Sequence, residues 1–488
     1  MPSTGNGAER KQSARTDSES GGTNRAITRR RYLTATGIVG ATALAGCSGG
    51  DGGGGGDGNG ESGGGGDGGD GGSTGNGSNS AATELSVAAV EGSGRLFKRL
   101  MDEYVSDDTG IDVSVQLFPY ANLFEKTNSI LSTQSDAYDI MFMDDPWFPQ
   151  FAANVDPLLD WLPGELPRDQ IIENCVEIAT WPTPNAPTVP SAEGLEQKVR
   201  GQVIVGNTQL YAYNSAYYDQ VGADAPETWA DVLEAGQQIS EQIDGANGYI
   251  IRGKRGNPAM ANFFSLGNAV GGTMFDENWR YQWDGDAGTE AVRFWAEDLK
   301  SISPDGVTSF DSDAVLNGLG SGSAAQAPAW PSAASLLLDP DESQEANNLE
   351  FIPIPKGHTG AERQAPTQGN WIMGINSYVT DAKKKAAGQV IQSAISAEAQ
   401  SKYVELGGVP FRHDTFENHM DAQTWFPALY ESLQNAQWRP RTPLYSEFGV
   451  NHGQLLNTAL AGDISPSEMT SQAKEQIEST LQTAGYYS

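Results

Sequence analysis

The residues of this sequence that could do chemistry are mostly carboxylates. Asp and Glu number 63, against 30 Lys and Arg, four His and two Cys. Asp144 and Asp145 stand side by side, directly before Pro146 and Trp147. Two carboxylates are enough to hydrolyse a glycosidic bond. In a chain this acidic, however, paired carboxylates are common, so the pair alone does not indicate an enzyme.

Other reactive arrangements are missing from the sequence. The histidines, His358, His413, His419 and His452, form no pair at metal-ligand spacing, and there is no HExxH, CxxC, Walker loop or GxSxG elbow. Cys175 lies in an apolar stretch and is expected to be a buried thiol. We therefore expect neither a metal nor a cofactor, and we expect the chain not to be an enzyme.

The formal net charge of −33 argues against binding to nucleic acid. Carboxylates crowded this densely repel one another in dilute buffer, whereas at about 1 M salt the Debye length falls to about 3 Å and screens the repulsion. The acid excess therefore favours a halophilic protein. The alternative is an acidic protein from low-salt surroundings.

The N-terminal segment predicts export and lipid attachment. Arg29 and Arg30 precede a short apolar stretch, and this order resembles a twin-arginine export signal. Leu44 to Cys47 then resembles a lipobox, in which Cys47 accepts a lipid; the alternative is a chance LAGC in an Ala-rich run. The apolar stretch is shorter than the roughly 20 residues that span a bilayer. We expect residues 1–46 to be a signal peptide and Cys47 to be the membrane anchor.

Residues 47–82 are predicted to be a flexible tether. Of the 33 residues from Ser48 to Ser80, 19 are Gly, and most of the others are Asp, Ser or Asn. Such a composition cannot bury an apolar core. The folded domain is therefore expected to comprise residues 83–488.

Short apolar strands and amphipathic helices alternate from Thr83 onward. Strands are predicted at 85–90, 111–117 and 138–143, with helices at 96–104 and 121–131. This order predicts a parallel α/β sheet with right-handed crossovers. Ligands bind such sheets at the carboxyl ends of the strands, where Glu91, Tyr120 and the loop 144–147 lie.

The second half of the chain alternates less regularly. Residues 203–213 are predicted to be extended, and apolar spacing over 292–302 predicts a helix. Capping boxes at Thr228–Asp231 and Ser465–Glu468 predict two further helix starts.

Several segments of residues 83–488, taken in order, resemble family 1 extracellular solute-binding proteins, the maltose-binding-protein-like group that feeds ABC importers. The segments are Tyr138–Trp147, Gln209–Asn214, Pro226–Trp229, Ala324–Trp330, Ile352–Gly357, Gly369–Ile375, Gly407–Pro410 and Arg439–Pro443. No one segment is diagnostic, but their order is. With its acid excess, the chain resembles a haloarchaeal-type member.

The resemblance implies a type II periplasmic-binding-protein-like α/β fold, in which hinge crossings join two lobes around a ligand cleft. Lobe 1 would comprise about 83–206 and 371–425, and lobe 2 about 210–370 and 426–488. A ligand that contacts both lobes only in the closed form would drive closure. The implied partners are a carbohydrate ligand and ABC permease subunits with their cytoplasmic ATPase. The protein would be a monomer on the extracellular face of the membrane.

A sugar carries hydroxyl groups around apolar C–H faces, so its recognition requires carboxylates, amides or Arg together with aromatic rings. We expect the ligand to contact polar and aromatic side chains at strand ends and hinges. These are Glu91, Tyr120, Asp144, Asp145, Trp147, Asn207, Trp330, Asn370, Trp371 and Arg412. Each has an alternative role: packing for a Trp, helix capping for Asp144 or Asp145, and an ion pair for Arg412. Arg439 and Arg441 are expected to be structural.

Replacing Trp371 with Ala is expected to weaken binding by about tenfold or more and to leave stability nearly unchanged. Two other functions stay open. One is the same fold binding glycerol phosphate or a polyamine, and the other is a secreted carbohydrate-active enzyme. A phosphate ligand would require a cluster of Arg or Lys in the cleft, and the scarcity of basic residues argues against it.

Overall fold

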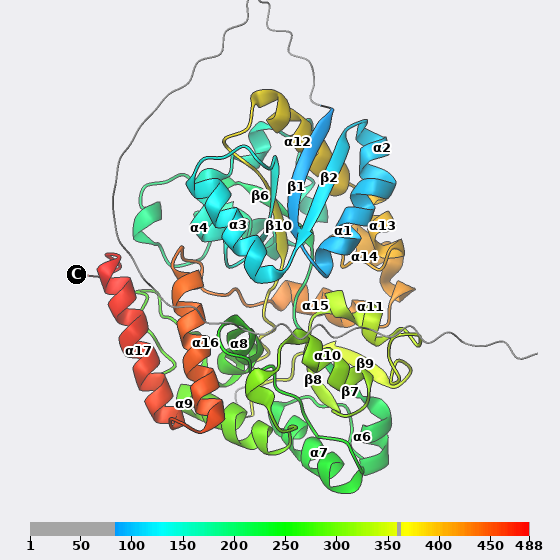
Figure 1. The fold of residues 1–488 in the computed structure, drawn as a ribbon, viewed down its shortest axis with the longest axis vertical. Coiled ribbons are helices and arrows are strands. Elements are labelled where there is room, and N and C mark those ends of the chain that lie inside the picture. The colour runs from blue at the N-terminus through cyan, green and yellow to red at the C-terminus, as the bar shows by residue number, and fades with distance from the viewer. Residues whose placement is uncertain (1–82, 359–362, 488) are drawn as a thin grey trace, which may run out of the picture. The chain divides into compact units, whose positions relative to one another are not determined.

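The computed structural model describes residues 83–358 and 363–487, which form two main β-sheets with helices packed around each (Figure 1). The predicted signal peptide, the anchor at Cys47 and the tether lie outside these residues. Within the described ranges, no helix is long and apolar enough to cross a membrane.

The first sheet has five strands in the order β2-β1-β3-β10-β6. The strands are β1 (Glu84–Val90), β2 (Asp112–Phe118), β3 (Ile140–Asp144), β6 (Gly201–Val205) and β10 (Trp371–Ile375). β1 pairs in parallel with β2 and β3, whereas β10 runs antiparallel to β3 and β6. The predicted parallel β1, β2 and β3 are therefore confirmed, and β10 joins them from more than 200 residues further along the chain.

The second sheet is antiparallel, in the order β8-β7-β9. Its strands are β7 (Leu210–Asn214), β8 (Gln326–Ala329) and β9 (Leu349–Pro353). Residues 203–213, predicted as one extended stretch, are divided between the two sheets, because β6 ends at Val205 and β7 begins at Leu210. Gly206 lies at the break, where a Cβ atom would be 2.1 Å from the carbonyl oxygen of Pro410.

The helices fall into two groups. Those that accompany the first sheet are α1 (Ser93–Leu100), α2 (Ser106–Thr109), α3 (Tyr120–Ser132), α4 (Phe148–Phe151), α5 (Glu173–Glu177), α12 (Asp381–Ala394), α13 (Ala397–Glu405) and α14 (His413–His419). The others are α6 (Ser215–Val221), α7 (Trp229–Gln242), α8 (Asn257–Gly271), α9 (Asp286–Arg293), α10 (Ser312–Gly320), α11 (Ala334–Leu337), α15 (Phe426–Asn435), α16 (Tyr445–Ala461) and α17 (Pro466–Thr483). Two π-helices, Met101–Val105 and Phe294–Leu299, continue α1 and α9, and β4 (Thr180–Trp181) pairs with β5 (Lys198–Val199).

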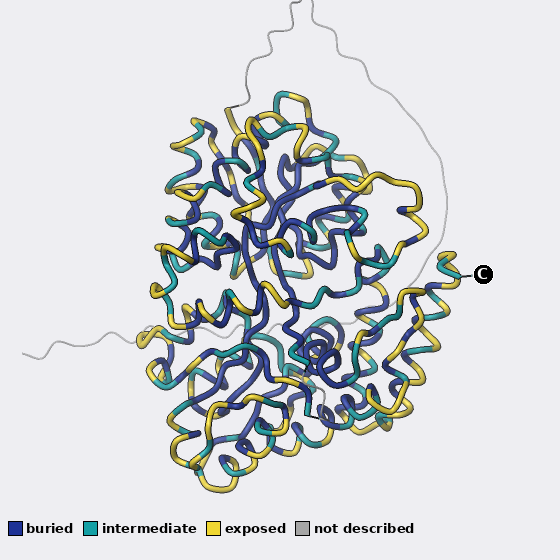
Figure 2. The backbone as a smooth tube through the Cα atoms, turned by 180° about the vertical axis from the view of Figure 1, so that it is seen from behind, coloured by how far each residue is buried: buried dark blue, intermediate teal, exposed yellow. Residues whose placement is uncertain are grey.

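Local signals explain several of these elements. Both predicted capping boxes are present, at the starts of α7 and α17. In contrast, α8 has no side-chain cap and is buried on nearly all its faces, so it carries no amphipathic signal that would reveal it in the sequence. The strands β3, β6 and β10 are buried at every position, and Figure 2 shows this buried backbone at the centre, with exposed segments outside it.

Two chain segments cross between the sheets, and a third segment bonds to them. The first is 206–209, the second precedes β10, and the third follows α15. Gly369 N donates to Asn207 O at 2.7 Å, and Gln209 N donates to Thr367 O at 2.9 Å. Gln437 joins them, because its N donates to Pro366 O at 2.7 Å and its O accepts from Gln368 N at 3.1 Å. The crossings therefore form a small hydrogen-bonded ribbon.

Candidate functional site

The carboxyl end of β3 carries a buried ion-pair network. Asp144 is the last residue of β3, and its backbone oxygen accepts from Trp147 N at 3.0 Å in the turn that follows. Arg439, in the segment that follows α15, reaches this turn. Its Nη2 donates to Asp144 Oδ1 at 2.8 Å and to Asp145 Oδ2 at 2.7 Å. These three side chains are almost entirely buried, and neither carboxylate caps α4, so the two aspartates hold the arginine instead.

Arg441 contacts the same turn through a backbone carbonyl group. Its Nη1 donates to the Asp145 carbonyl at 2.6 Å and its Nη2 to the Ile178 carbonyl at 2.6 Å. Its Nε donates to Thr183 Oγ1 at 3.2 Å. Arg441 therefore has a structural role, as expected, whereas Arg439 also sets the charge around the two aspartates.

Aromatic side chains pack beside Asp144. Tyr120, at the start of α3, donates its hydroxyl to Asp144 Oδ2 at 2.8 Å, and its ring lies 4.7 Å from that of Trp147. Trp371, at the start of β10, lies edge-on to Trp147 at 5.8 Å and stacks on Phe142 at 5.0 Å. A carboxylate, a phenol and two indoles thus meet at one edge of the first sheet, which is the combination that polyhydroxylated ligands require.

The electrostatics of this cluster raise the pKa values of Tyr120 and Asp145. Burial raises the pKa of Asp145; Arg439 opposes that shift, and Asp144 adds to it. Burial also raises the pKa of Tyr120 well above its ordinary value, and the charge of Asp144 adds to the shift. Tyr120 therefore keeps its proton at neutral pH and remains a hydrogen-bond donor.

Arg252 and Tyr445 belong to the part of the chain that holds the second sheet, and both interact electrostatically with groups of this cluster. Arg252 follows an extended segment that lies along β8, since Ile250 N donates to Gln326 O at 3.2 Å. Tyr120, Asp144 and Arg439 are among the groups that act on the pKa of Arg252. Tyr445, the first residue of α16, is buried and lies within electrostatic range of Arg439 and both aspartates.

The other predicted contacts lie in different places. Asn207 and Trp330 meet the crossing segments: Asn207 Oδ1 accepts from Ser332 N at 3.3 Å, and the Trp330 ring closes so tightly on Gly369 that a Cβ there would be 2.4 Å away. Asn370 is buried beside the aspartates, where its Nδ2 donates to Cys175 Sγ at 3.4 Å and its backbone O accepts from Asp145 N at 3.0 Å.

Glu91 and Arg412 do not join the cluster. Glu91 is exposed after β1. Arg412 Nε donates to Asp414 Oδ1 at 2.8 Å and its Nη1 to the Ile395 carbonyl at 2.8 Å, so its guanidinium is occupied by the first sheet's own helices. The alternative role of Arg412, an ion pair, is the one that the contacts show.

One cavity lies next to the ion-pair network. Its lining includes residues of α5, which accompanies the first sheet, and of α8, which belongs to the other group of helices. It has a volume of about 380 Å³, within the range of small-molecule sites. Asn174 and Glu177 line it from α5, Asn268 from α8 and Trp279 from the loop after α8. Arg439 and Arg441 of the network also line it. None of the predicted contact residues lines it.

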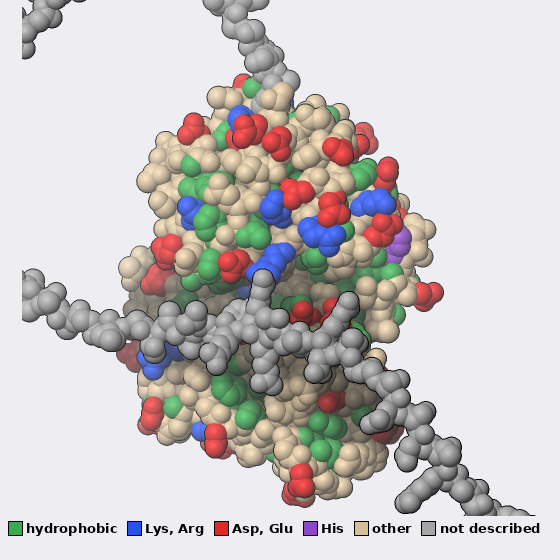
Figure 3. Space-filling model, turned by 45° about the vertical axis from the view of Figure 1, so that its right-hand side comes forward, with side chains coloured by type: hydrophobic (Ala, Val, Ile, Leu, Met, Phe, Trp, Pro, Cys, Tyr) green, Lys and Arg blue, Asp and Glu red, His purple; other side chains and the backbone are tan. Residues whose placement is uncertain are grey.

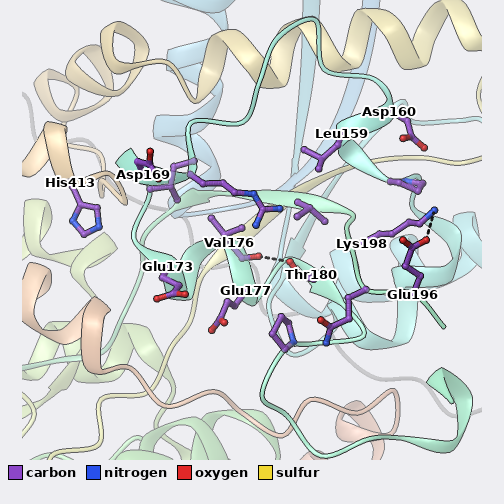
Figure 4. A pocket seen from close by; sticks show the side chains of 16 residues that line it. Leu159, Asp160, Asp169, Glu173, Val176, Glu177, Thr180, Glu196, Lys198 and His413 are labelled. Atoms are coloured by element: carbon purple, nitrogen blue, oxygen red, sulfur yellow. Dashed lines mark hydrogen bonds and ion pairs between the residues drawn. The ribbon is translucent and has the colours of Figure 1, made fainter. Parts of the chain in front are cut away.

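A second cavity, of about 730 Å³, has no residue of the network in its lining and is shown in Figure 4. Its lining comes from residues 157–199 and His413, and it contains none of the predicted contact residues. Lys198 and Glu196 pair across 3.4 Å at its edge, where both are exposed. Because its lining includes no residue of the second sheet or its helices, it is not a space between the two sheets.

The sequence reasoning missed Arg252 and Tyr445 and assigned Arg439 only a structural role. A signal existed for Arg439 and Arg441, which stand in the Arg-Pro-Arg-Thr-Pro segment of a chain poor in basic residues. No local pattern marks Arg252 or Tyr445. Among the described residues, no cluster of three or more His, Cys, Asp or Glu could hold a metal ion.

The chain is similar in sequence to known solute-binding proteins. The model of the bacterial extracellular solute-binding protein family matches residues 178–401. A probable amino-acid ABC transporter periplasmic-binding protein of Sinorhizobium fredii is 23% identical over 409 residues, covering 82% of this chain and 90% of the relative. The mannitol-binding protein of Pseudomonas aeruginosa is 25% identical over 433 residues, covering 83% of this chain and 94% of the relative.

A solved structure shares the fold. The ABC transporter solute-binding protein of Agrobacterium radiobacter K84, solved in complex with ribitol, matches with a TM-score of 0.71. It is 20% identical, and the match covers 82% of this chain and 99% of that one. The predicted type II periplasmic-binding-protein-like fold is confirmed by this likeness.

Proposed function

Since this chain belongs to the bacterial extracellular solute-binding protein family, we propose that it is the substrate-binding component of an ABC importer for a sugar or polyol. The observation that carries the proposal is the cluster in which Tyr120 donates to Asp144 beside Trp147 and Trp371. The mannitol-binding relative supports the ligand class. The protein would not act as an enzyme.

The ligand would bind between the two sheets and close the protein around itself. Tyr120, Asp144, Trp147 and Trp371 would hold it from the first sheet, and Arg252 and Tyr445 from the other side. Asp145 acts through Arg439. A ligand that contacts both sides only when they are close shifts the population toward the closed form. The hydrogen-bonded crossings around Thr367 are the proposed hinge, between lobes with the boundaries predicted from the sequence.

The remaining predicted contacts keep a place in the proposal. Asn207, Trp330 and Asn370 would meet the ligand at the crossings, where their side chains already lie. Glu91 is free to approach a larger ligand from the exposed end of β1. Arg412 would contribute only if its pair with Asp414 opened.

We further propose a monomer that leaves the cell by twin-arginine export and stays on the outer face of the membrane through a lipid on Cys47. The permease subunits and their cytoplasmic ATPase would be its partners. The acid excess supports a halophilic habitat, and Figure 3 shows acidic and basic side chains interspersed on one face. The charge of −33 would then be screened by salt at about 1 M or more.

The test is a binding screen with the purified protein in multimolar KCl. Sugars, polyols and amino acids are added, and tryptophan fluorescence and thermal unfolding are recorded. A saturable response to sugars or polyols without product formation is expected. A response only to amino acids would move the assignment to another solute, and turnover of a sugar would replace the receptor with an enzyme.

A further inference from the structure

The cavity of about 380 Å³ beside the ion-pair network is separate from the residues that carry the proposed function, because none of the four side chains of the ligand cluster lines it. One part of its wall comes from α5 and from the loop 185–187, between β4 and β5. Another part comes from α8 and the loop 273–279 that follows it, and residues 436–441 complete the lining. A molecule in this cavity would therefore contact side chains from both groups of helices.

Two residues in the wall of this cavity have a strained backbone. Asn185 has a φ of 59° and Trp279 a φ of 63°, and among the described residues Gln134 is the one other non-glycine residue with a left-handed φ. Asparagine tolerates this conformation, whereas a residue as bulky as tryptophan is a clear outlier there. Such strain persists only where the surrounding structure enforces it, and it concentrates at ligand sites. The strain therefore points to a function for this wall.

The side chain of Trp279 is held firmly in that wall. Its Nε1 donates to the Thr188 carbonyl at 2.9 Å, so the loop after α8 touches the loop between β4 and β5 at this point. Its ring lies 5.3 Å from that of Phe275 and 5.4 Å from that of Tyr486. The indole is therefore an apolar surface that is preorganised before any ligand arrives.

Two N–H groups of lining residues have no acceptor among the described residues. They are Trp438 Nε1 and Arg439 Nε, and both atoms are buried. The Nη atoms of Arg439, in contrast, donate to Asp144 and Asp145. A buried N–H group without an acceptor is costly, and native structures rarely leave one in that state. An oxygen of a bound molecule would supply the acceptor that these two donors lack.

The charges at the cavity leave no positive excess. Arg439 and Arg441 contribute two cations to the lining. Asp144, which pairs with Arg439 at 2.8 Å, and the lining residue Glu177 contribute two anions, and Asp145 adds a third when it is ionised. The other lining side chains are uncharged. An anion would find no unmatched cation here, and a cation would lie near two guanidiniums, so the lining favours an uncharged ligand.

We propose that this cavity is a second binding site, for a small uncharged molecule that carries hydroxyl groups around an apolar face, such as a single sugar ring or a polyol. The apolar face lies on the indole of Trp279, and the oxygens accept from Trp438 Nε1 and Arg439 Nε. The volume is at the lower end of the range for small-molecule sites, so the cavity holds one such molecule. This inference goes beyond the proposed function, because the site is distinct from the cluster around Asp144.

The experiment counts bound molecules by calorimetric titration of the full-length protein at one fixed KCl concentration. Sorbitol, mannitol and glucose are the uncharged probes, and gluconate is the anion that matches sorbitol in size. For an uncharged probe we expect two molecules per chain, one at the cluster and one in the cavity. Gluconate should not enter the cavity.

Variants assign each binding event to its site. Ala186→Trp and Thr273→Trp each fill the cavity from a different part of its wall, and each should abolish one event and leave the other within about threefold. Ala225→Trp is the matched control, because Ala225 is exposed and lines neither this cavity nor the larger one, and it should keep both events. Trp438→Phe removes one donor and should weaken the cavity event about fivefold. Tyr120→Phe should weaken only the event at the cluster.

The outcomes separate this inference from the proposed function. If an uncharged probe binds as one molecule that Tyr120→Phe weakens and both filling variants retain, the receptor stands and the second site is wrong. If both filling variants instead abolish a single event, the second site stands and the cluster is not the ligand site. A gluconate event that the filling variants abolish would overturn the uncharged class.

If the folded protein binds none of these probes, this inference is wrong, and the wider screen of sugars, polyols and amino acids decides the proposed function separately. Thermal unfolding of each variant, recorded in the same buffer, identifies any that has lost its fold. Should both filling variants unfold, Trp438→Phe decides the question, since an unchanged affinity in that variant would remove the cavity as a site.

Discussion

The guanidinium of Arg439 donates hydrogen bonds to Asp144 and to Asp145, from a position 295 residues beyond the first of them. It thereby connects the segment between α15 and α16 to the turn at the end of β3. Since the same turn supports Tyr120 and Trp147, the geometry of the proposed ligand contacts depends on this contact.

Replacing Arg439 with Met should lower the free energy of unfolding by about 3–5 kcal/mol, because it leaves two buried carboxylates without their cation. Urea denaturation at constant KCl measures the change. Arg99→Met is the control: Arg99 pairs with Glu103 at 2.8 Å with both side chains half exposed, so about 1 kcal/mol or less is expected. Equal losses in the two variants would show that the buried pairs do not stabilise the turn.

Replacing Tyr120 with Phe should weaken ligand binding by about tenfold and lower the free energy of unfolding by about 1 kcal/mol. The substitution removes the hydroxyl that donates to Asp144 and keeps the ring that packs on Trp147. Titration of whichever ligand the screen identifies measures the affinity. Tyr138→Phe removes a comparable bond, to Gln116 at 2.7 Å near the opposite end of β3, and should leave the affinity unchanged. An unchanged affinity for Tyr120→Phe would remove this residue from the site.

His452 should make the protein less stable in mild acid. Burial lowers the pKa of this imidazole to about 3, and its Nε2 lies 2.9 Å from the Tyr281 hydroxyl. The unfolded chain, with a pKa of about 6.5, binds the proton first, so stability is present above pH 6.5 and is lost as pH falls. Between pH 6.5 and 5 the loss should be about 1.6 kcal/mol. His452→Gln should flatten that part of the stability profile, and a profile with the same slope would refute the assignment.

Replacing Cys47 with Ser should release the protein from membranes into the medium, because the sulfur that would carry the lipid is gone. Cell fractionation with immunoblotting measures the distribution. Cys175→Ser is the control, since Cys175 is a buried free thiol that should leave the protein on the membrane. Membrane retention of the Cys47 variant would show that another feature anchors the chain.

The structure changes one expectation for Trp371. Its indole is 5% exposed and packs on Phe142, Trp147 and Tyr120, so Trp371→Ala removes core packing as well as any ligand contact. A loss of about 3–5 kcal/mol is typical of such a change, contrary to the nearly unchanged stability expected from the sequence. Tyr120→Phe is therefore the cleaner test of the cluster.

The sequence by itself determined the local elements of this protein and much of the candidate site. Short apolar runs placed β1 and β3, period-two alternation placed β2, and two capping boxes placed the starts of α7 and α17, because these signals act over a few residues. The rule that strand ends form sites selected Tyr120, Asp144 and Trp147. Only the tertiary structure decided that β10 inserts between β3 and β6, that α8 is a buried helix, and that Arg439 pairs with both Asp144 and Asp145. These outcomes depend on pairing and charge compensation between segments far apart in the chain, which no local spacing encodes.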